Sequence, residues 1–289
     1  MASTTDFVTS NTSLVKASQL TIFGLGLINA MLANRYYSVS INTTLNEKFG
    51  ILTNEHTPKG TLLTPIYPRL KYLVIGNGGI PVADDATNYR FSQHCAIDGA
   101  LFNHLPFALK TPSEDFNDVE RRRYRLRKEV RIDGELYYAY YARVVETIDY
   151  RGYPYLITHR DGVDVLSVFN TNIERILNPR PVIKPDKPLD SLRVDTVINR
   201  FKLEFFMSEK DQEELQNVYK ILKISQYTKL TEIGVCHGYD VIVPYGLEVA
   251  DTQISYFLDI DLDVALEFDA RAVFKRNLEL GGAEPFYVI

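Results

Sequence analysis

A long alternation of apolar and polar residues near the C-terminus constrains the fold more than any other feature of the chain. From Ile254 to Phe268 every even-numbered position is apolar, and most odd-numbered positions are polar. A period of two that is kept over this length is typical of a β-strand with one buried face. Such a long strand needs neighbours to pair with, so the sequence predicts a sheet as the main structural element.

Two Asp-Gly pairs predict tight turns between further strands. Asp-Gly is a favoured pair in two-residue hairpins because both central residues adopt a positive φ. Aromatic residues make up 12% of the chain, which also favours strands. The predicted hairpins are Glu129–Ile132 with Leu136–Ile148 around Asp133-Gly134, Tyr155–His159 with Val163–Phe169 around Asp161-Gly162, and Thr231–Cys236 with Tyr239–Val243 around His237-Gly238.

Three segments predict helices. The apolar run Leu20–Leu32 indicates a buried N-terminal helix with Asn11 or Ser13 as its N-cap. Acidic residues at the end of 111–120 favour a helix start, and we expect that helix to continue through Arg127 or Lys128. Ser208, followed by several acidic residues, predicts another helix start. The expected fold class is therefore α+β, with mostly antiparallel β hairpins in a sandwich-like arrangement, an N-terminal helix and a few further helices.

A proline-rich segment predicts a domain boundary. Residues 178–188 contain four prolines, which remove backbone donors and favour an extended linker. We expect an N-terminal helix or arm at 1–34, a β-rich domain with a basic helix at 35–180, and a smaller β-rich domain with one helix at 190–289.

Composition excludes several classes of protein. The 289 residues carry a net charge of -5, whereas a protein that coats nucleic acid would be basic. Two cysteines are too few for a disulfide-rich scaffold. The apolar run Leu20–Leu32 is shorter than the roughly 20 residues that a membrane span needs. We therefore expect no nucleic-acid partner, no membrane span, and synthesis in a reducing cytoplasm.

Three patterns resemble chemical sites but lack residues that the chemistry needs. Gly76–Gly79 has neither the lysine of a phosphate loop nor the helix start of a dinucleotide fingerprint. The row of alternate aspartates from Asp259 lacks the glycine and glutamate of a calcium loop. The residues His94-Cys95, Cys236-His237 and His104 lack the ligand pairs typical of zinc sites. We expect no enzyme, with no catalytic residue, cofactor or metal, and keep a metal site as the lesser alternative.

Charged and aromatic clusters instead indicate protein–protein contact. Seven basic residues fall between Arg121 and Arg131, and they predict either a solvated helix with internal ion pairs or a patch for an acidic neighbour. A tyrosine-rich strand follows, and the aspartate row predicts either a solvated face or a docking site for a basic partner. The expected interface residues are Arg121, Arg122, Arg125, Tyr137, Tyr140, Asp259, Asp261 and Asp263.

Some of these motifs resemble a known group of proteins. The run Thr231-Glu232-Ile233-Gly234 is similar to a strand of tail and baseplate proteins from tailed bacteriophages. The stretch from Tyr72 to Tyr141 resembles uncharacterised phage virion proteins, with 74–79, 98–107, the arginine run and the tyrosine strand as its markers. The resemblance implies a structural protein of the virion in the baseplate wedge region, made in the host cytoplasm. Its implied partners are other virion proteins and copies of itself.

Two alternatives remain open. Within the virion, the chain is also compatible with a neck or head–tail connector protein. Outside that class, acidic residues such as Asp259 and Asp261 suggest a carbohydrate-active enzyme, which needs two carboxylates about 5–5.5 Å apart in a concave site.

Overall fold

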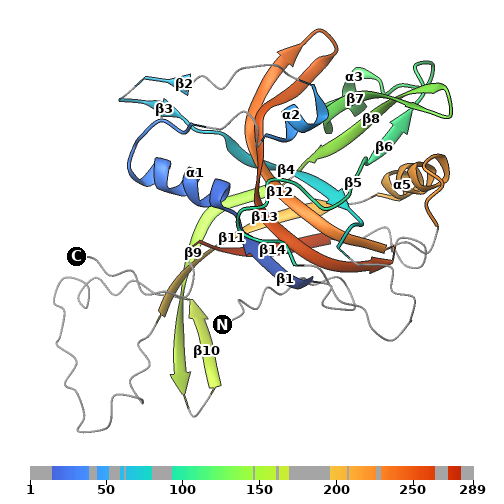
Figure 1. Ribbon diagram of the computed structural model, residues 1–289. Helices are drawn as coiled ribbons and strands as arrows, with labels where there is room; N and C mark the ends of the chain where they lie inside the picture. Colours follow the sequence, from blue (N-terminus) through green and yellow to red (C-terminus); the bar gives the residue numbers. More distant parts are fainter. Residues whose placement is uncertain are drawn as a thin grey trace, which may run out of the picture.

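One large antiparallel sheet organises the computed structural model (Figure 1). Its strand order is β1-β13-β12-β4-β8-β6, with β5 beside β4 and β7 beside β8. Every pairing within it is antiparallel, which confirms the predicted α+β class with mostly antiparallel strands. The strands are β1 Val15–Leu20, β4 Arg69–Gly76, β5 His104–Leu105, β6 Ala108–Lys110, β7 Tyr124–Ile132, β8 Glu135–Val144, β12 Lys229–Val243 and β13 Gly246–Asp263.

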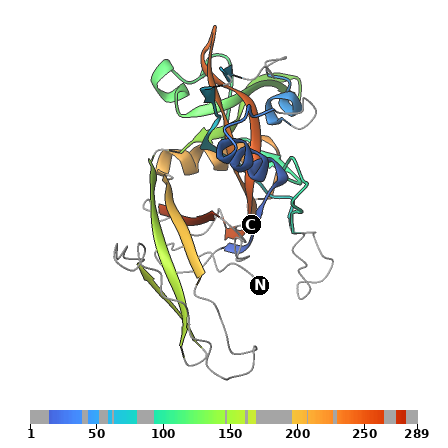
Figure 2. The same cartoon turned by 90° about the vertical axis from the view of Figure 1, so that its left-hand side faces the viewer.

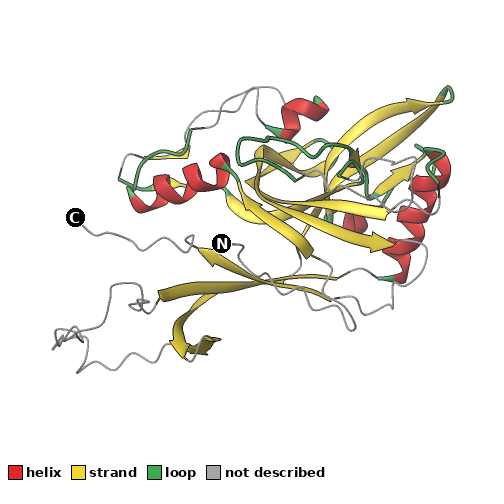
Figure 3. Ribbon diagram, turned by 60° about the horizontal axis from the view of Figure 1, so that its bottom comes forward, coloured by secondary structure: helices red, strands yellow, loops and turns green. Residues whose placement is uncertain are grey.

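The structure describes residues 15–38, 44–51, 59–61, 63–79, 93–145, 147–160, 163–168, 196–206, 208–225, 229–263 and 273–280. Within these ranges the helices are α1 Ile22–Leu32, α2 Leu45–Phe49, α3 Asp118–Arg121 and α5 Glu209–Ile221. Figure 3 shows how few helices accompany the strands. None of the helices in the described ranges is long and apolar enough to cross a membrane.

Two smaller sheets complete the described strands. One has the order β10-β9-β11-β14, and the other pairs β2 with β3. In Figures 1 and 2 the β9–β10 ribbon points away from the large sheet. These strands are β2 Lys59–Gly60, β3 Pro65–Ile66, β9 Thr147–Arg160, β10 Val163–Val168, β11 Thr196–Phe206 and β14 Val273–Leu280.

Turn chemistry predicted two hairpins correctly and one wrongly. Asp133 and Gly134 both have positive φ between β7 and β8. β9 and β10 also pair as predicted, although Asp161-Gly162 lies outside the described residues. The third prediction is wrong because His237-Gly238 lies inside the continuous strand β12, at a register shift. A Cβ at Gly238 would lie 2.5 Å from Val249 Cγ2, so this glycine permits close approach of β13 instead of a turn.

Both larger sheets combine strands from either side of the proline-rich segment 178–188. β4 pairs with β12, and β9 pairs with β11. The strand pairing therefore does not divide the chain into the expected units 35–180 and 190–289. Residues 178–188 themselves lie outside the described ranges, and β1 of the expected N-terminal arm pairs with β13.

The helix predictions succeeded where the capping residues were local. Ser208 caps α5, and its side chain exchanges hydrogen bonds with Asp211 in a capping box, as predicted. At the N-terminus the predicted caps are wrong: Thr21 caps α1, because residues 15–20 are held as a strand along β13. Asn11 and Ser13 lie outside the described residues.

The predicted basic helix is wrong. α3 ends at Arg121, and β7 begins at Tyr124. The acidic start does form the helix, with Asn117 and Glu120 in a capping box. The arginines that follow are extended because β7 pairs along β8 from Tyr124 to Ile132. Strand pairing within the β7–β8 hairpin thus outweighs the helix-like order of charges in this segment.

The large sheet is buried on both faces. On β4, Leu73 and Ile75 belong to a core that includes Leu215 of α5, whereas Tyr72 and Val74 belong to a second core. The second core includes α2, whose buried residues include Leu45 and Phe49. The prediction of one buried face for the C-terminal strand is therefore wrong, since residues 249–260 of β13 are buried at odd and even positions alike. Residues 264–268 of that prediction lie outside the described ranges.

Candidate functional site

Two of the three expected interface arginines are neutralised within the chain. Arg121 Nη2 lies 2.8 Å from Asp115 Oδ2, and its Nη1 donates a hydrogen bond to the Tyr245 carbonyl. Arg125 is 3% exposed and pairs with Asp240 at 3.2 Å. These side chains connect α3 and β7 to the β12–β13 hairpin. Their charges therefore stabilise contacts within the chain.

A buried carboxylate that the sequence analysis missed shapes this region. Leu126 has a φ of 53°, and its neighbours Arg125 and Arg127 pair with Ala142 and Tyr140 of β8 in one continuous register. Glu248 of β13 accepts hydrogen bonds from the backbone nitrogens of Leu126 at 2.6 Å and Arg127 at 3.1 Å. Burial raises the pKa of Glu248, and these amides act against that shift. The buried carboxylate thus joins β13 to β7 through two backbone amides.

The two expected interface tyrosines differ in exposure. Tyr140 is buried, and its hydroxyl donates a hydrogen bond of 2.6 Å to Asp115. Tyr137 is half-buried and donates to Glu135 near the tip of the β7–β8 hairpin. Tyr140 therefore contributes to the core, and Tyr137 keeps some accessible surface.

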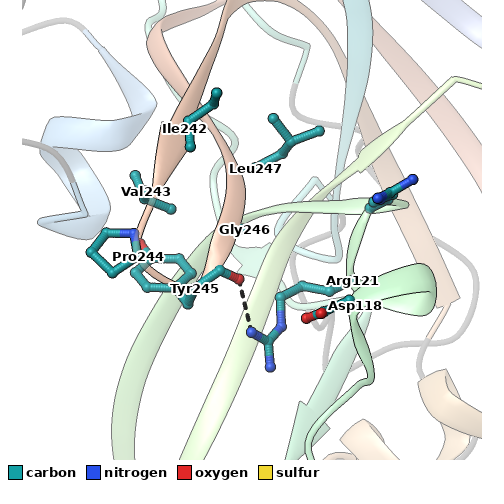
Figure 4. A pocket seen from close by; sticks show the side chains of 9 residues that line it. Asp118, Arg121, Ile242, Val243, Pro244, Tyr245, Gly246 and Leu247 are labelled. Carbon is teal, nitrogen blue, oxygen red and sulfur yellow. Dashed lines mark hydrogen bonds between the residues drawn. The ribbon is translucent and has the colours of Figure 1, made fainter.

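An open hollow of about 580 Å³ lies between α3 and the tip of the β12–β13 hairpin. Figure 4 shows Asp118 and Arg121 facing the hairpin, with a dashed hydrogen bond from Arg121 to the Tyr245 carbonyl. Ile242 is 88% exposed. The hollow thus brings together the expected interface residues Arg121 and Arg122, and its lining is Asp118, Arg121, Arg122, Ile242, Val243, Pro244, Tyr245, Gly246 and Leu247.

The expected acidic row begins inside the protein. Asp259 is 5% exposed, and in the strand register it lies opposite Glu232 of β12. Burial raises the pKa of Asp259 to about 6; the nearby His94 acts against this shift, and Glu232 adds to it. Asp259 is therefore not part of a solvated face in this chain. The side chains of Asp261 and Asp263 lie outside the described part of the structure.

Glu232 is fully buried and binds two loops at once. Its Oε1 accepts hydrogen bonds from the backbone nitrogens of Gly78 at 2.5 Å and Asn103 at 3.3 Å. Its Oε2 accepts from Phe102 N at 2.7 Å and lies 2.9 Å from His94 Nε2. We call these residues, with Asp98 and Asp259, the Glu232 cluster. It joins three of the five segments that carry the virion resemblance, namely 74–79, 98–107 and Thr231–Gly234.

His94 is the centre of this cluster. Its ring stacks on Phe102 at 4.1 Å and on Phe257 at 3.9 Å between centroids. Nδ1 lies 3.6 Å from Asp98 Oδ2, on the side opposite Glu232. The His94 ring and the Glu232 carboxylate are buried, and together they hold loop residues on the large sheet.

His104, His237 and the two cysteines lie outside the Glu232 cluster and differ in exposure. Burial lowers the pKa of His237 to about 3 and that of His104 to about 3, so both imidazoles are neutral at pH 7. His237 lies 2.8 Å from the Tyr37 hydroxyl and 2.6 Å from Ser255 Oγ. Cys95 is exposed and Cys236 is buried; both are free. In the described ranges no group of three His, Cys, Asp or Glu side chains is arranged to hold a metal ion.

Helix α1 presents an apolar surface that is accessible in the single chain. Its sequence, IFGLGLINAML, has no charged residue. Only Gly24 and Leu27 of the helix are buried, and Gly24 packs so closely on Ser255 that a Cβ would lie 2.7 Å from its carbonyl oxygen. We define the α1 apolar face by Ile22, Leu25 and Leu32, which lie on one side of the helix, together with Met31 at its C-terminal end; these side chains are 46–74% exposed.

Comparison with known protein families gives a match over nearly the whole chain. A family of unknown function, DUF7208, matches residues 9–288, which is nearly the whole chain. No curated protein and no solved structure matches the chain.

Proposed function

We propose that this chain, which belongs to the DUF7208 family, is a structural component of a tailed-phage particle, in the baseplate wedge region. It acts by binding other virion proteins and copies of itself in a symmetric assembly. The assignment to a phage particle rests on the resemblance of Thr231–Gly234 and of the stretch from Tyr72 to Tyr141. The assignment to a binding role rests on the surface of the molecule.

The α1 apolar face is the observation that carries the binding role. A soluble protein seldom keeps an uncharged helix with four exposed large apolar side chains unless another molecule covers it. Ile97, which is also exposed, belongs to the loop whose Ala96 carbonyl accepts a hydrogen bond from the Ile22 amide. The apolar surface therefore continues from the helix onto this loop.

The Glu232 cluster supports a scaffold role. It fixes the loop that carries Ile97 to the large sheet through a buried carboxylate and a stacked imidazole. A surface held in this way changes little on binding, which reduces the entropic cost of assembly.

The carbohydrate-enzyme alternative has less support. Asp259, one of the acidic residues on which it was based, is buried beside Glu232. The hollow at the β12–β13 hairpin contains one carboxylate, that of Asp118, whereas glycoside hydrolysis ordinarily needs two.

Quantitative mass spectrometry of purified particles tests the proposal. The phage that encodes the chain would be purified, and the chain counted against the major capsid protein in whole particles and in isolated tails. A low copy number near a multiple of six, retained in the tails, is expected for a baseplate protein. Retention in heads alone would favour a neck protein, and absence from the particle would contradict a structural role.

A further inference from the structure

Arg122 differs from the arginines on either side of it. Arg121, Arg123 and Arg125 each have a carboxylate partner within 3.4 Å. Arg122 is exposed at the C-cap of α3; its backbone N–H donates to the Glu120 carbonyl, and its own carbonyl accepts from Arg125 Nη1. Its guanidinium has no carboxylate partner among the residues that the structure describes. Among the five arginines from Arg121 to Arg127, Arg122 is therefore the one without a carboxylate partner in the described residues, and it lines the hollow.

The rest of the hollow supplies apolar surface next to that charge. Ile242 is 88% exposed and lies opposite Leu247 in the β12–β13 register, and Val243 and Pro244 also line the hollow. The opposite wall is fixed, because Arg121 is bound to both Asp115 and the Tyr245 carbonyl. A preformed hollow with an apolar wall and one free guanidinium suits a ligand that has an apolar group beside an anion.

From these contacts we infer that the hollow binds a segment of a partner protein in which one carboxylate stands next to an apolar side chain. The carboxylate pairs with Arg122, for which the planar guanidinium fork is well matched, and the apolar side chain covers Ile242. Asp118 lines the same hollow and disfavours a second negative charge. The site therefore selects a single acidic residue within an apolar segment over an acidic run. It is independent of whether the partner belongs to a phage particle.

A peptide array tests this inference on the purified full-length protein. The array displays seven-residue peptides, Gly-Ser-X-X-X-Ser-Gly, in which the three central positions vary over all residues except cysteine. Binding of the wild-type protein is compared with Arg122→Glu, Ile242→Ser and a matched control, Arg131→Glu. Arg131 is an exposed arginine of β7 outside the hollow. Thermal unfolding of each variant shows that it is folded.

We expect the wild-type protein to select peptides with one Asp or Glu beside Leu, Ile, Val or Phe. Arg122→Glu should weaken their binding about tenfold or more, as loss of a charged hydrogen bond implies, and Ile242→Ser should remove the apolar preference. Arg131→Glu should bind as the wild type does. No acidic selection, or the same selection by Arg122→Glu, would overturn the inference. Binding of inorganic phosphate that Arg122→Glu abolishes, with no peptide selected, would also overturn it, because it would indicate a small-anion site.

Discussion

Asp259 and Asp240 are carboxylates on neighbouring strands whose surroundings shift their charge states in opposite directions. Burial raises the pKa of Asp259 to about 6. Burial acts in the same direction on Asp240, but hydrogen bonds from Lys71 and Tyr72, together with the charge of Arg125, hold its pKa below the usual range. Ionisation of Asp259 therefore opposes folding at neutral pH, and ionisation of Asp240 supports it.

Replacing Asp259 with asparagine should stabilise the protein at neutral pH. A carboxyl whose pKa is higher in the folded state contributes stability below pH 4, and that contribution is lost as the pH rises through about 6. We expect Asp259→Asn to raise the free energy of unfolding by about 1–2 kcal/mol at pH 7.5. Urea unfolding at pH 5 and pH 7.5 measures this, and a variant less stable than the wild type at pH 7.5 would contradict it.

Asp240→Asn is the matched control, and it should have the opposite sign. Its carboxyl has a lowered pKa, so its stabilising contribution is present above pH 4 and is lost as the pH falls through the folded-state value. The variant should be less stable than the wild type at pH 7.5. The difference between the two proteins should shrink below pH 4.

Glu232→Gln should destabilise the protein more than its conservative chemistry suggests. Both carboxylate oxygens of Glu232 accept backbone hydrogen bonds, from Gly78 and Phe102, so an amide nitrogen in either place would face another donor. We expect a loss of about 2–4 kcal/mol in the free energy of unfolding by urea titration. Glu129→Gln, at an exposed position of β7, should change it by less than about 0.5 kcal/mol. Equal effects of the two variants would show that the cluster does not hold the loops.

At the scale of elements, α5 is attached to the large sheet by a buried ion pair. Arg143 of β8 is fully buried, and its Nη1 lies 2.9 Å from Asp211 Oδ2 of the capping box. Although burial acts to raise it, the charge of Arg143 and hydrogen bonds from Ser208 keep the pKa of Asp211 low. The carboxylate thus both caps the helix and neutralises a buried guanidinium.

Breaking that pair should cost far more than breaking a surface pair on the same helix. Asp211→Asn leaves the charge of Arg143 buried and should lower the free energy of unfolding by about 3 kcal/mol or more. Lys210→Ala removes an exposed pair with Glu120 and should cost less than about 1 kcal/mol. Chemical unfolding of both variants makes the comparison, and similar losses would contradict a buried anchor.

Substitutions on α1 should separate folding from binding. Leu25 is exposed and Leu27 is buried, two positions apart on one helix. Leu27→Ala should destabilise the protein by about 2–4 kcal/mol. Leu25→Glu should leave its thermal unfolding within about 2 °C of the wild type, yet reduce its incorporation into particles when supplied in place of the wild-type chain. Normal incorporation of Leu25→Glu would show that this face is not an interface.

The elements that were predicted correctly from the sequence are those whose conformation is set by neighbouring residues. Asp133-Gly134 and the Ser208 capping box form from neighbouring residues, so their patterns are readable in the chain. The arginines after α3 carry a helix-like order of charges, but their conformation is set by pairing with β8 and by Glu248, which lies about 120 residues away. The candidate site follows the same rule. Arg122 was expected at an interface from composition, whereas the wall formed by Ile242 required the fold.

At the scale of the whole molecule, the large sheet joins segments from both halves of the chain. Strand β4 pairs with β12. Glu232 of β12 accepts a hydrogen bond from the backbone of Gly78, which lies 154 residues earlier in the sequence. A proline-rich stretch is a local signal for a linker and carries no information about such pairings. For the same reason the role of Glu232 was not predicted, although its four-residue motif was noted.

Hydroxyl-radical footprinting of free protein and of purified particles tests most directly whether the α1 apolar face is a binding surface in a virion. Met31 is 53% exposed and is an oxidation-sensitive reporter at the C-terminal end of α1. With doses normalised to an added reference peptide, Met31 and the peptide that contains Leu25 should be oxidised at least fivefold more slowly in particles than in the free chain. Equal oxidation in the two states would contradict the proposal that assembly covers this helix.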